Sequence, residues 1–279
     1  MKNPKVLYIL ISVFCVFAIL AGIYAQFIDA DYGGLDLAAE DANKIEQEKS
    51  QVEIKDEFDQ LFTNNISLND FDTTGISKLN AEKDIVYTIY EKLEINDNYE
   101  VDIHIPIINI KSDVANRLNQ NTQTIFVNKA NEILQNTEPS KKSIYSIDYT
   151  AYVNGNILSI AIMSTLKESS ASQRIIVQTY NYNLSTNSEV SLIDLLTIKQ
   201  LNRDEVNAKI MEVVKQADEE DKALQSMGYN QVYMRDLNSD IYKVENAGGY
   251  FLGPDNTLYI VYAYGNGEFT SKMDIIVFE

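Results

Sequence analysis

The sequence predicts an α+β protein in which antiparallel sheets and two packed helices follow a transmembrane helix and an acidic stalk. Three observations predict it: a charge-free apolar run near the amino terminus, an acidic segment behind it, and alternation of apolar and polar residues beyond about residue 80. Two stretches of helical spacing interrupt that alternation. Apolar residues make up 45% of the 279 residues, so the chain is too hydrophobic to be disordered and a folded domain is expected.

Residues 1–28 are expected to be a short cytoplasmic tail and a transmembrane signal-anchor. The run VLYILISVFCVFAILAGIYA covers 20 uncharged residues, 6–25. At about 1.5 Å per residue it spans roughly 30 Å, enough to cross a bilayer. Lys2 and Lys5 precede the run and acidic residues follow it, so the positive-inside rule places the amino terminus in the cytoplasm and the rest of the chain outside. The predicted location is a single-pass position in the cell membrane.

The single cysteine, Cys15, lies within this apolar run. One cysteine cannot form an intramolecular disulfide, and it excludes a metal site built from cysteines. Phe14 stands where a lipoprotein signal needs a small residue, so lipidation is not expected. Cleavage after Ala25 is the alternative to a retained anchor, although Ile23 fits the cleavage pattern poorly.

Residues 29–79 are expected to form an acidic linker. Residues 29–72 contain 13 acidic and 3 basic residues, a net charge of −10, and almost no β-rich run. Such a segment is typical of a charged spacer, and we expect the fold to survive its removal. A helix over residues 41–62 is the alternative, because five apolar residues there have partial helical spacing: Ile45, Val52, Phe58, Leu61 and Phe62.

Residues 80–170 are expected to form a first α+β subdomain. Residues 85–95 and 99–110 alternate as two half-buried strands, and the turn Asn96-Asp97-Asn98 joins them into a hairpin. A helix is then expected over 111–135, where an apolar stripe repeats every three to four residues and Pro139 follows. Two further strands are expected at 143–153 and 157–167, joined at Asn154-Gly155-Asn156.

Residues 171–279 are expected to form a second α+β subdomain. A strand at 173–184 completes an antiparallel meander with the two strands before it. The second helix is expected at about 202–217, where Asn202 is the predicted N-cap. Strands at 257–264 and 273–278 end the chain, and each helix is expected to cover one sheet face.

The net charge of −18 restricts the partners. It arises from 41 acidic and 23 basic residues, and the part outside the membrane, without Lys2 and Lys5, carries 21 basic against 41 acidic residues, or −20. An acidic surface repels phosphate backbones, so nucleic-acid binding is not expected and cationic partners are favoured. Solubility alone is the alternative reason for the acidity.

No residue is assigned a catalytic role. His104 is the single histidine, so a triad would depend on it, but it lies in an alternating run and is expected on the polar face of a strand. Ser164 and Lys167 match the S-x-x-K motif of penicillin-recognising enzymes. They fall on a predicted strand, where positions i and i+3 point to opposite faces, so the match is interpreted as coincidence.

No metal or cofactor site is assigned either. Asp236, Asn238 and Asp240 have the spacing that opens a calcium loop, but Ile241 replaces the required glycine and Ala247 the required glutamate. The acidic run at 218–221 is interpreted as a solvated helix end. The glycines at 248–249 and 265–267 flank strands and are interpreted as turns, not as phosphate-binding loops.

The region after residue 80 resembles a known bacterial family. The order YEVDIHIPII, then FVNKANEIL, then YVNGNILSIAI and QRIIVQTYNYNLSTNSEVSLIDLL is similar to the extracytoplasmic region of lysozyme-responsive (RsiV-like) anti-sigma-V factors. A similar module precedes the catalytic domain of PdaC-like peptidoglycan deacetylases. The closing segment YFLGPDNTLYIVYAYGNGEF also resembles this family. The sequence has neither the sigma-binding region nor a deacetylase domain, so the resemblance implies the binding module alone, with lysozyme as a precedent for its ligand.

These observations predict a membrane-anchored extracytoplasmic binding or sensing module, not an enzyme. Its expected partner is lysozyme, another cationic protein or peptidoglycan; the contact residues stay unassigned. The alternatives are an enzyme, or an accessory subunit, acting on envelope polysaccharide, and a structural envelope protein. Five tyrosines either provide the apolar centre of an interface or fill strand faces: Tyr229, Tyr233, Tyr259, Tyr262 and Tyr264.

Overall fold

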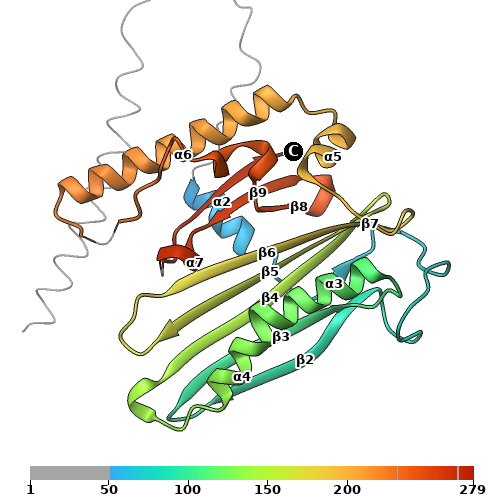
Figure 1. Cartoon of the computed structure of the whole chain (residues 1–279), viewed down its shortest axis with the longest axis horizontal. Coiled ribbons are helices and arrows are strands. Elements are labelled where there is room, and N and C mark those ends of the chain that lie inside the picture. Colours follow the sequence, from blue (N-terminus) through green and yellow to red (C-terminus); the bar gives the residue numbers. More distant parts are fainter. Residues whose placement is uncertain (1–50, 231, 269) are drawn as a thin grey trace, which may run out of the picture. The chain divides into compact units, whose positions relative to one another are not determined.

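The computed structural model describes residues 51–230, 232–268 and 270–279, which lie in one compact unit, Lys49–Glu279. This unit is a mixed α+β fold, as the sequence predicts (Figure 1). The transmembrane helix expected over residues 6–25 lies outside the described residues. Within them, no helix has both the length and the apolar character needed to cross a membrane.

The larger sheet has seven strands in the order β2-β3-β4-β5-β6-β7, and β1 pairs with β4 off this path. The strands expected from alternation are confirmed to within about two residues. The strands of this sheet are β1 (Ile66–Ser67), β2 (Val86–Ile95), β3 (Tyr99–Ile108), β4 (Ser143–Asn154), β5 (Ile157–Glu168), β6 (Arg174–Asn183) and β7 (Ser188–Glu189).

The sheet is not entirely antiparallel, which corrects the prediction. Strands β3 and β4 are parallel, as are β1 and β4, while the hairpin β2-β3 and the meander β4-β5-β6 are antiparallel as expected. A helical crossover separates β3 from β4 along the chain, and such a crossover returns the chain in its original direction.

The helix predicted over 111–135 forms this crossover and covers one face of the larger sheet (Figure 1). It consists of α3 (Asp113–Thr122), a π-helical turn (Gln123–Val127) and α4 (Asn128–Leu134). The Ser112 side chain caps its start by accepting a hydrogen bond from the backbone N–H of Ala115. The apolar stripe of the helix and the inner face of the sheet form one core.

A second layer contains a three-stranded antiparallel sheet in the order β10-β9-β8. Helix α6 lies along its outer side (Figure 1), and its inner side packs against β5, β6 and α2. The elements of this layer are α5 (Leu192–Lys199), α6 (Arg203–Ser226), β8 (Gly249–Leu252), β9 (Leu258–Ala263), α7 (Gly265–Glu268) and β10 (Met273–Phe278). Short 3₁₀ turns lie at Pro139–Lys141, Asp240–Tyr242, Val244–Asn246 and Pro254–Asn256.

Residues 51–79, expected to belong to the linker, are instead part of the folded unit. Helix α2 (Gln51–Asp59) lies in the segment where a helix was the alternative. Its Phe58 is fully buried, with its ring centre 6.1 Å from that of Phe251 and 5.9 Å from that of Tyr259. A few well-spaced apolar side chains therefore anchor a segment whose composition is otherwise that of a solvated spacer.

The division expected at residues 170 and 171 falls between β5 and β6. These two strands pair over ten residues, from Leu166 opposite Arg174 to Ile157 opposite Asn183. The larger sheet therefore runs without interruption through this point.

Helix α6 is longer than predicted, because it continues to Ser226 instead of ending near residue 217. Asp218 and Asp221, interpreted as part of a solvated helix end, are 1% and 0% exposed. They extend the buried stripe of the helix at helical spacing, and ionic partners stabilise them there. The short elements α5, β1 and β7 had no sequence prediction. Of the glycines interpreted as turns, Gly249 begins strand β8 and residues 265–267 form most of the four-residue helix α7.

Candidate binding surface

The two faces of the larger sheet are covered differently. Helices α3 and α4 lie over one face, and the second layer lies over the other face at β5 and β6. At β2, β3 and the first half of β4, this second face has no described helix or strand over it. We call this region the open face; its residues are Glu91, Leu93, Ile95, Glu100, Asp102, His104, Ile144, Ser146 and Asp148.

Strand register arranges the open face as three rows. The first row is Ile95, Glu100 and Ile144, the second is Leu93, Asp102 and Ser146, and the third is Glu91, His104 and Asp148. Directly opposed residues on neighbouring strands share a face, with Cβ atoms about 4.5–5.5 Å apart. Residues far apart in the chain therefore form one contiguous patch.

Three large apolar side chains are exposed on this patch. Leu93 is 75% exposed, Ile95 67% and Ile144 45%. Leu93 and Ile95 are neighbours on one face of β2, and Ile144 lies on β4 beyond Glu100. Isolated exposed apolar residues are ordinary, but several close together among polar residues are typical of a surface that contacts another molecule. The open face therefore exposes apolar side chains of the kind that a protein interface buries.

Four carboxylates lie among these apolar side chains. Glu91 and Asp102 have side chains that are 70% and 54% exposed, Asp148 is 31% exposed, and Glu100 lies between Ile95 and Ile144. In the described part of the chain, no lysine or arginine forms an ion pair with these four residues. Their charges therefore act on the solvent side and attract cations.

His104 lies at one end of this surface, on the polar side of its strand as predicted. Its Nδ1 is 3.3 Å from Asp148 Oδ1 and 3.6 Å from Asp102 Oδ1, and its Nε2 is 3.6 Å from Glu91 Oε1. A protonated imidazole would pair with these carboxylates. No group of His, Cys, Asp and Glu side chains among residues 51–230, 232–268 and 270–279 is arranged to hold a metal ion.

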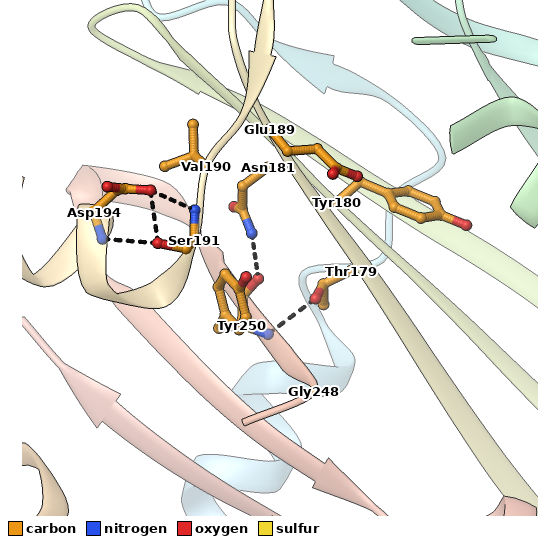
Figure 2. Close-up of a pocket in the computed structure, with 9 residues that line it drawn as sticks. All are labelled: Thr179, Tyr180, Asn181, Glu189, Val190, Ser191, Asp194, Gly248 and Tyr250. Atoms are coloured by element: carbon orange, nitrogen blue, oxygen red, sulfur yellow. Dashed lines mark hydrogen bonds between the residues drawn. The ribbon is translucent and has the colours of Figure 1, made fainter. Parts of the chain in front are cut away.

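A groove between β6, β7, α5 and β8 is a second candidate (Figure 2). One cavity of about 300 Å³ adjoins another of about 350 Å³, and the two share Glu189, Val190 and Asp194. The first is lined by Thr179, Tyr180, Asn181, Glu189, Val190, Ser191, Asp194, Gly248 and Tyr250. Most of these residues come from β6, β7, α5 and β8, or from the turns next to them.

The polar groups of this groove are already engaged within the protein. The Asn181 side chain donates to the Tyr250 carbonyl at 2.7 Å, and the Tyr250 N–H donates to Thr179 Oγ1 at 2.9 Å (Figure 2). Asp194 accepts two hydrogen bonds from Ser191 in a capping box, which keeps the pKa of the Asp194 carboxyl below its usual value. Glu189 pairs with Arg117 at 2.8 Å. The Thr179 and Asn181 side chains hold β8 against β6, so we assign the groove a structural role.

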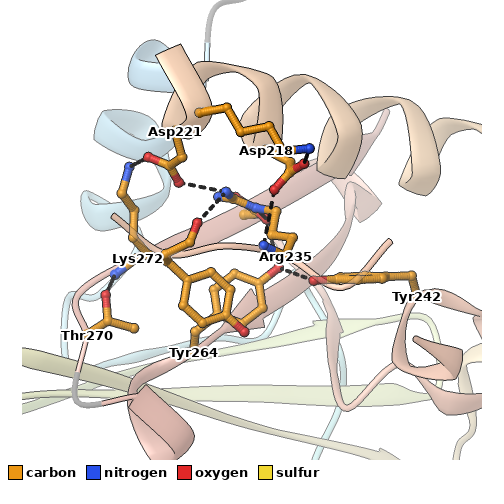
Figure 3. Close-up of polar contacts among 10 residues, drawn as sticks. Asp218, Asp221, Arg235, Tyr242, Tyr264, Thr270 and Lys272 are labelled. Carbon is orange, nitrogen blue, oxygen red and sulfur yellow. Dashed lines mark hydrogen bonds and ion pairs between the residues drawn. The ribbon is translucent and has the colours of Figure 1, made fainter. Parts of the chain in front are cut away.

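A buried ion cluster lies between α6 and β10 (Figure 3). The Arg235 guanidinium donates two hydrogen bonds to Asp274, both at 2.6 Å, and one to Asp221 at 2.7 Å. Lys272 Nζ also donates to Asp221, at 2.8 Å, and the Arg235 backbone N–H donates to Asp218 at 3.2 Å. We call these five residues the Arg235 cluster. Each of its carboxylates has a cationic partner.

Tyrosines enclose the Arg235 cluster. Tyr264 donates a hydrogen bond to Asp274 at 2.7 Å, and its hydroxyl lies 3.2 Å from that of Tyr242 (Figure 3). The rings of Tyr233 and Tyr264 stack with centres 4.1 Å apart, and the Arg235 guanidinium lies within 6 Å of both ring centres. Burial raises the pKa of the Tyr264 hydroxyl, and the charge of Asp274 raises it further. Burial alone would lower the pKa of Arg235, but hydrogen bonds and charge from Asp274 outweigh it and raise that pKa. The cluster therefore holds the segment that contains Arg235, and strand β10, against α6.

The other residues considered in the sequence do not gather into a site. Ser164 and Lys167 lie on β5 and point to opposite faces, as expected; Ser164 is buried and Lys167 exposed. Of the five tyrosines, Tyr262 and Tyr264 are buried, whereas Tyr229 is 62% exposed. They do not provide the exposed apolar side chains of the open face, which are aliphatic and lie on the larger sheet. One feature of the sequence pointed to the open face: in the hairpin, the apolar Leu93 and Ile95 lie opposite the polar Asp102 and Glu100 of the neighbouring strand.

Comparison with solved structures matches seven chains, among them two DUF3298 family proteins. No family model matches the chain, and no curated protein matches it. A DUF3298 family protein from Pseudomonas aeruginosa is 12% identical with a TM-score of 0.37, and the match covers 70% of this chain and 88% of that one. A DUF3298 family member from Bacteroides fragilis is 11% identical with a TM-score of 0.31, and the match covers 64% of this chain and 80% of that one. Both of these structures are DUF3298 family proteins, and their similarity to this chain is too low to assign it a family or a function.

Proposed function

We propose that this chain is a binding module displayed outside the cytoplasmic membrane, and that its open face takes a cationic protein. The observation that carries the proposal is the open face itself, where exposed Leu93, Ile95 and Ile144 lie among four carboxylates without a lysine or arginine partner in the described chain. The location outside the membrane rests on the uncharged run 6–25 and the lysines that precede it.

The two kinds of side chain have separate roles in such a complex. The carboxylates accelerate the encounter with a cationic partner, and salt weakens that effect. The aliphatic side chains then lose contact with water, which stabilises the complex by roughly 1–2 kcal/mol for each residue. Specific interfaces combine buried apolar side chains with polar and charged groups.

Lysozyme is the cationic ligand that the family resemblance favours. Peptidoglycan fits the open face less well, because its peptide carboxylates would meet Glu91, Glu100 and Asp102 and like charges oppose association. A protein ligand also covers a flat surface such as a sheet face more completely than a single glycan chain does.

Surface plasmon resonance on the full chain in detergent tests the proposal. We expect lysozyme to bind, to bind more weakly at 0.15 M than at 0.01 M salt as the Debye length shortens from about 30 Å to about 8 Å, and to retain some affinity at the higher salt. Leu93→Ser should weaken binding roughly tenfold. Ile198→Ser is the matched control, because Ile198 is 50% exposed on α5, away from the open face.

Three results would contradict the proposal. Absence of binding at 0.01 M salt would remove lysozyme as the ligand. Binding that vanishes at 0.15 M salt would show charge attraction without an interface. Equal affinity of wild type and Leu93→Ser would place the interface elsewhere on the chain.

A further inference from the structure

Strand β2 is a long edge with no described partner on its outer side. It stands at one end of the seven-strand order and pairs only with β3. The opposite end of the sheet is β7, which has only two residues, and the edges of the small sheet have four and six residues. β2 has ten residues, Val86–Ile95. Folded proteins usually keep edge strands short or protected, because unpaired backbone groups recruit another strand.

The protection on β2 is confined to its first half. A register shift between Thr88 and Tyr90 marks a bulge there. From Tyr90 to Ile95 the pairing with β3 is regular, and four apolar side chains are exposed around this stretch: Ile89, Tyr90, Leu93 and Ile95. A regular edge with exposed apolar side chains is a template for a further strand.

The sequence of β2 fits a second copy of itself. Two copies of one strand can pair antiparallel around a two-fold axis normal to the sheet. Opposed side chains then lie on the same face only if one residue is directly opposite its own copy, and we name the axis by that residue. An axis through Glu91, Lys92 or Glu94 would place that charge opposite its own copy, which is destabilising. An axis through Tyr90 would bring the bulge at Thr88 into the pair.

An axis through Leu93 avoids both problems. It places Lys92 of each copy opposite Glu94 of the other, and it places Leu93 opposite Leu93. Glu91 then lies opposite Ile95. Within one copy, Lys92 Nζ already lies 2.7 Å from Glu94 Oε2 on the face that α3 and α4 cover, so the pairing forms an alternating group of two lysines and two glutamates.

We propose that two copies of this chain pair antiparallel through β2, with the two-fold axis at Leu93. The pairing joins two seven-stranded sheets and two open faces into one continuous surface. It leaves Leu93 and Ile95 exposed on the open face, so it does not depend on the proposed ligand. The acidic charge of the chain opposes association, but at 0.15 M salt repulsion beyond about 8 Å is largely screened.

Sedimentation of the full chain in detergent at 0.15 M salt, over a concentration series, tests this register through charge. In Lys92→Glu, residues 92 and 94 are both glutamates, so the dimer has two glutamate–glutamate contacts across the axis. In Glu94→Lys, it has two lysine–lysine contacts instead. Each single variant should raise the dimer dissociation constant roughly tenfold. The double variant Lys92→Glu/Glu94→Lys restores opposite charges and should return the constant to near the wild-type value.

Cross-linking gives a second, position-specific readout. In a Cys15→Ser background, a short thiol cross-linker should join two copies of Leu93→Cys, because the axis brings this residue next to its own copy. Val52→Cys is the matched control, since Val52 is 71% exposed on α2. Preferential cross-linking at residue 93 supports the proposal, and equal cross-linking at both positions opposes it.

The outcomes that overturn the proposal are distinct from failure of ligand binding, which neither experiment measures. A chain that stays monomeric at every concentration overturns it. So does a dimer indifferent to both single charge variants. Loss of the dimer in the single variants without recovery in the double variant rules out the register at Leu93. Circular dichroism of each variant confirms that the fold is retained.

Discussion

The Arg235 cluster and the open face contain the same kinds of charged residue in opposite arrangements. In the cluster, Asp221 and Asp274 are buried and each accepts hydrogen bonds from a cation at 2.6–2.8 Å. On the open face, Glu91 and Asp102 are exposed, and in the described chain His104 is the one basic side chain within 4 Å of their carboxylates. Buried charges must be paired for the chain to fold, whereas exposed charges need no partner. The Arg235 cluster therefore contributes to folding, whereas the carboxylates among exposed aliphatic residues on the open face support the proposed binding role.

The largest effect should follow from breaking the Arg235 cluster. Arg235→Met leaves Asp221 and Asp274 buried without the guanidinium, and the free energy of unfolding should fall by about 3–5 kcal/mol. Urea unfolding measures it. Lys55→Met is the control, because the Lys55–Asp59 pair is exposed and its loss should change stability by no more than about 0.5 kcal/mol. A loss below about 1 kcal/mol for Arg235→Met would show that the cluster is not held as described.

A slightly smaller effect is expected at Phe58, and it tests whether α2 is packed into the folded core. Phe58→Ala removes a fully buried ring from contact with Phe251 and Tyr259, so unfolding should become easier by about 3 kcal/mol. Val52→Ala on the same helix is the control, since Val52 is 71% exposed. Equal stability of wild type and Phe58→Ala would restore the linker interpretation of this segment.

The buried tyrosines should make the stability of the folded core sensitive to alkaline pH. Burial raises the pKa of Tyr145 to about 12 from an ordinary value of 10. The unfolded chain therefore loses this proton first, so the stabilisation is complete below pH about 10 and is lost as the pH rises towards 12. The loss should reach roughly 1–2 kcal/mol for this residue.

Unfolding curves between pH 8 and pH 12 measure this effect, with tyrosinate absorbance as a second signal. Tyr145→Phe should flatten the alkaline limb, whereas Tyr229→Phe should not, because Tyr229 is 62% exposed. Identical alkaline limbs for wild type and Tyr145→Phe would contradict the assignment.

The smallest effect on stability is expected on the open face. Asp102→Asn removes a charge that lies in water without a lysine or arginine partner in the described chain, so the free energy of unfolding should change by no more than about 0.5 kcal/mol. The same substitution should weaken binding of a cationic protein and reduce its salt dependence. If Asp102→Asn destabilises the fold by more than about 1 kcal/mol, the open face is structural and the contrast with the Arg235 cluster disappears.

Sequence periodicity was sufficient to predict most strands and the first crossover helix. Alternation reports which positions face a core, and Asn154-Gly155-Asn156 marks a tight turn, where Gly155 has a φ of +57°. Periodicity was insufficient where burial depends on a distant partner. Asp218 and Asp221 look like a solvated helix end because their partners, Arg235 and Lys272, lie far along the chain.

The sequence by itself determined the α+β class, the bounds of the long strands, the acidic charge and the prediction of a membrane anchor at 6–25. Only the tertiary structure decided that β3 and β4 are parallel, that Phe58 is buried, and that Leu93, Asp102 and Ile144 share one uncovered face. The physical reason is that local spacing specifies which side of an element is apolar, whereas pairing between distant segments specifies what that side meets. On β2, the alternation makes the side that bears Leu93 and Ile95 apolar, yet nothing in the described chain covers that side, and the open face exists for that reason.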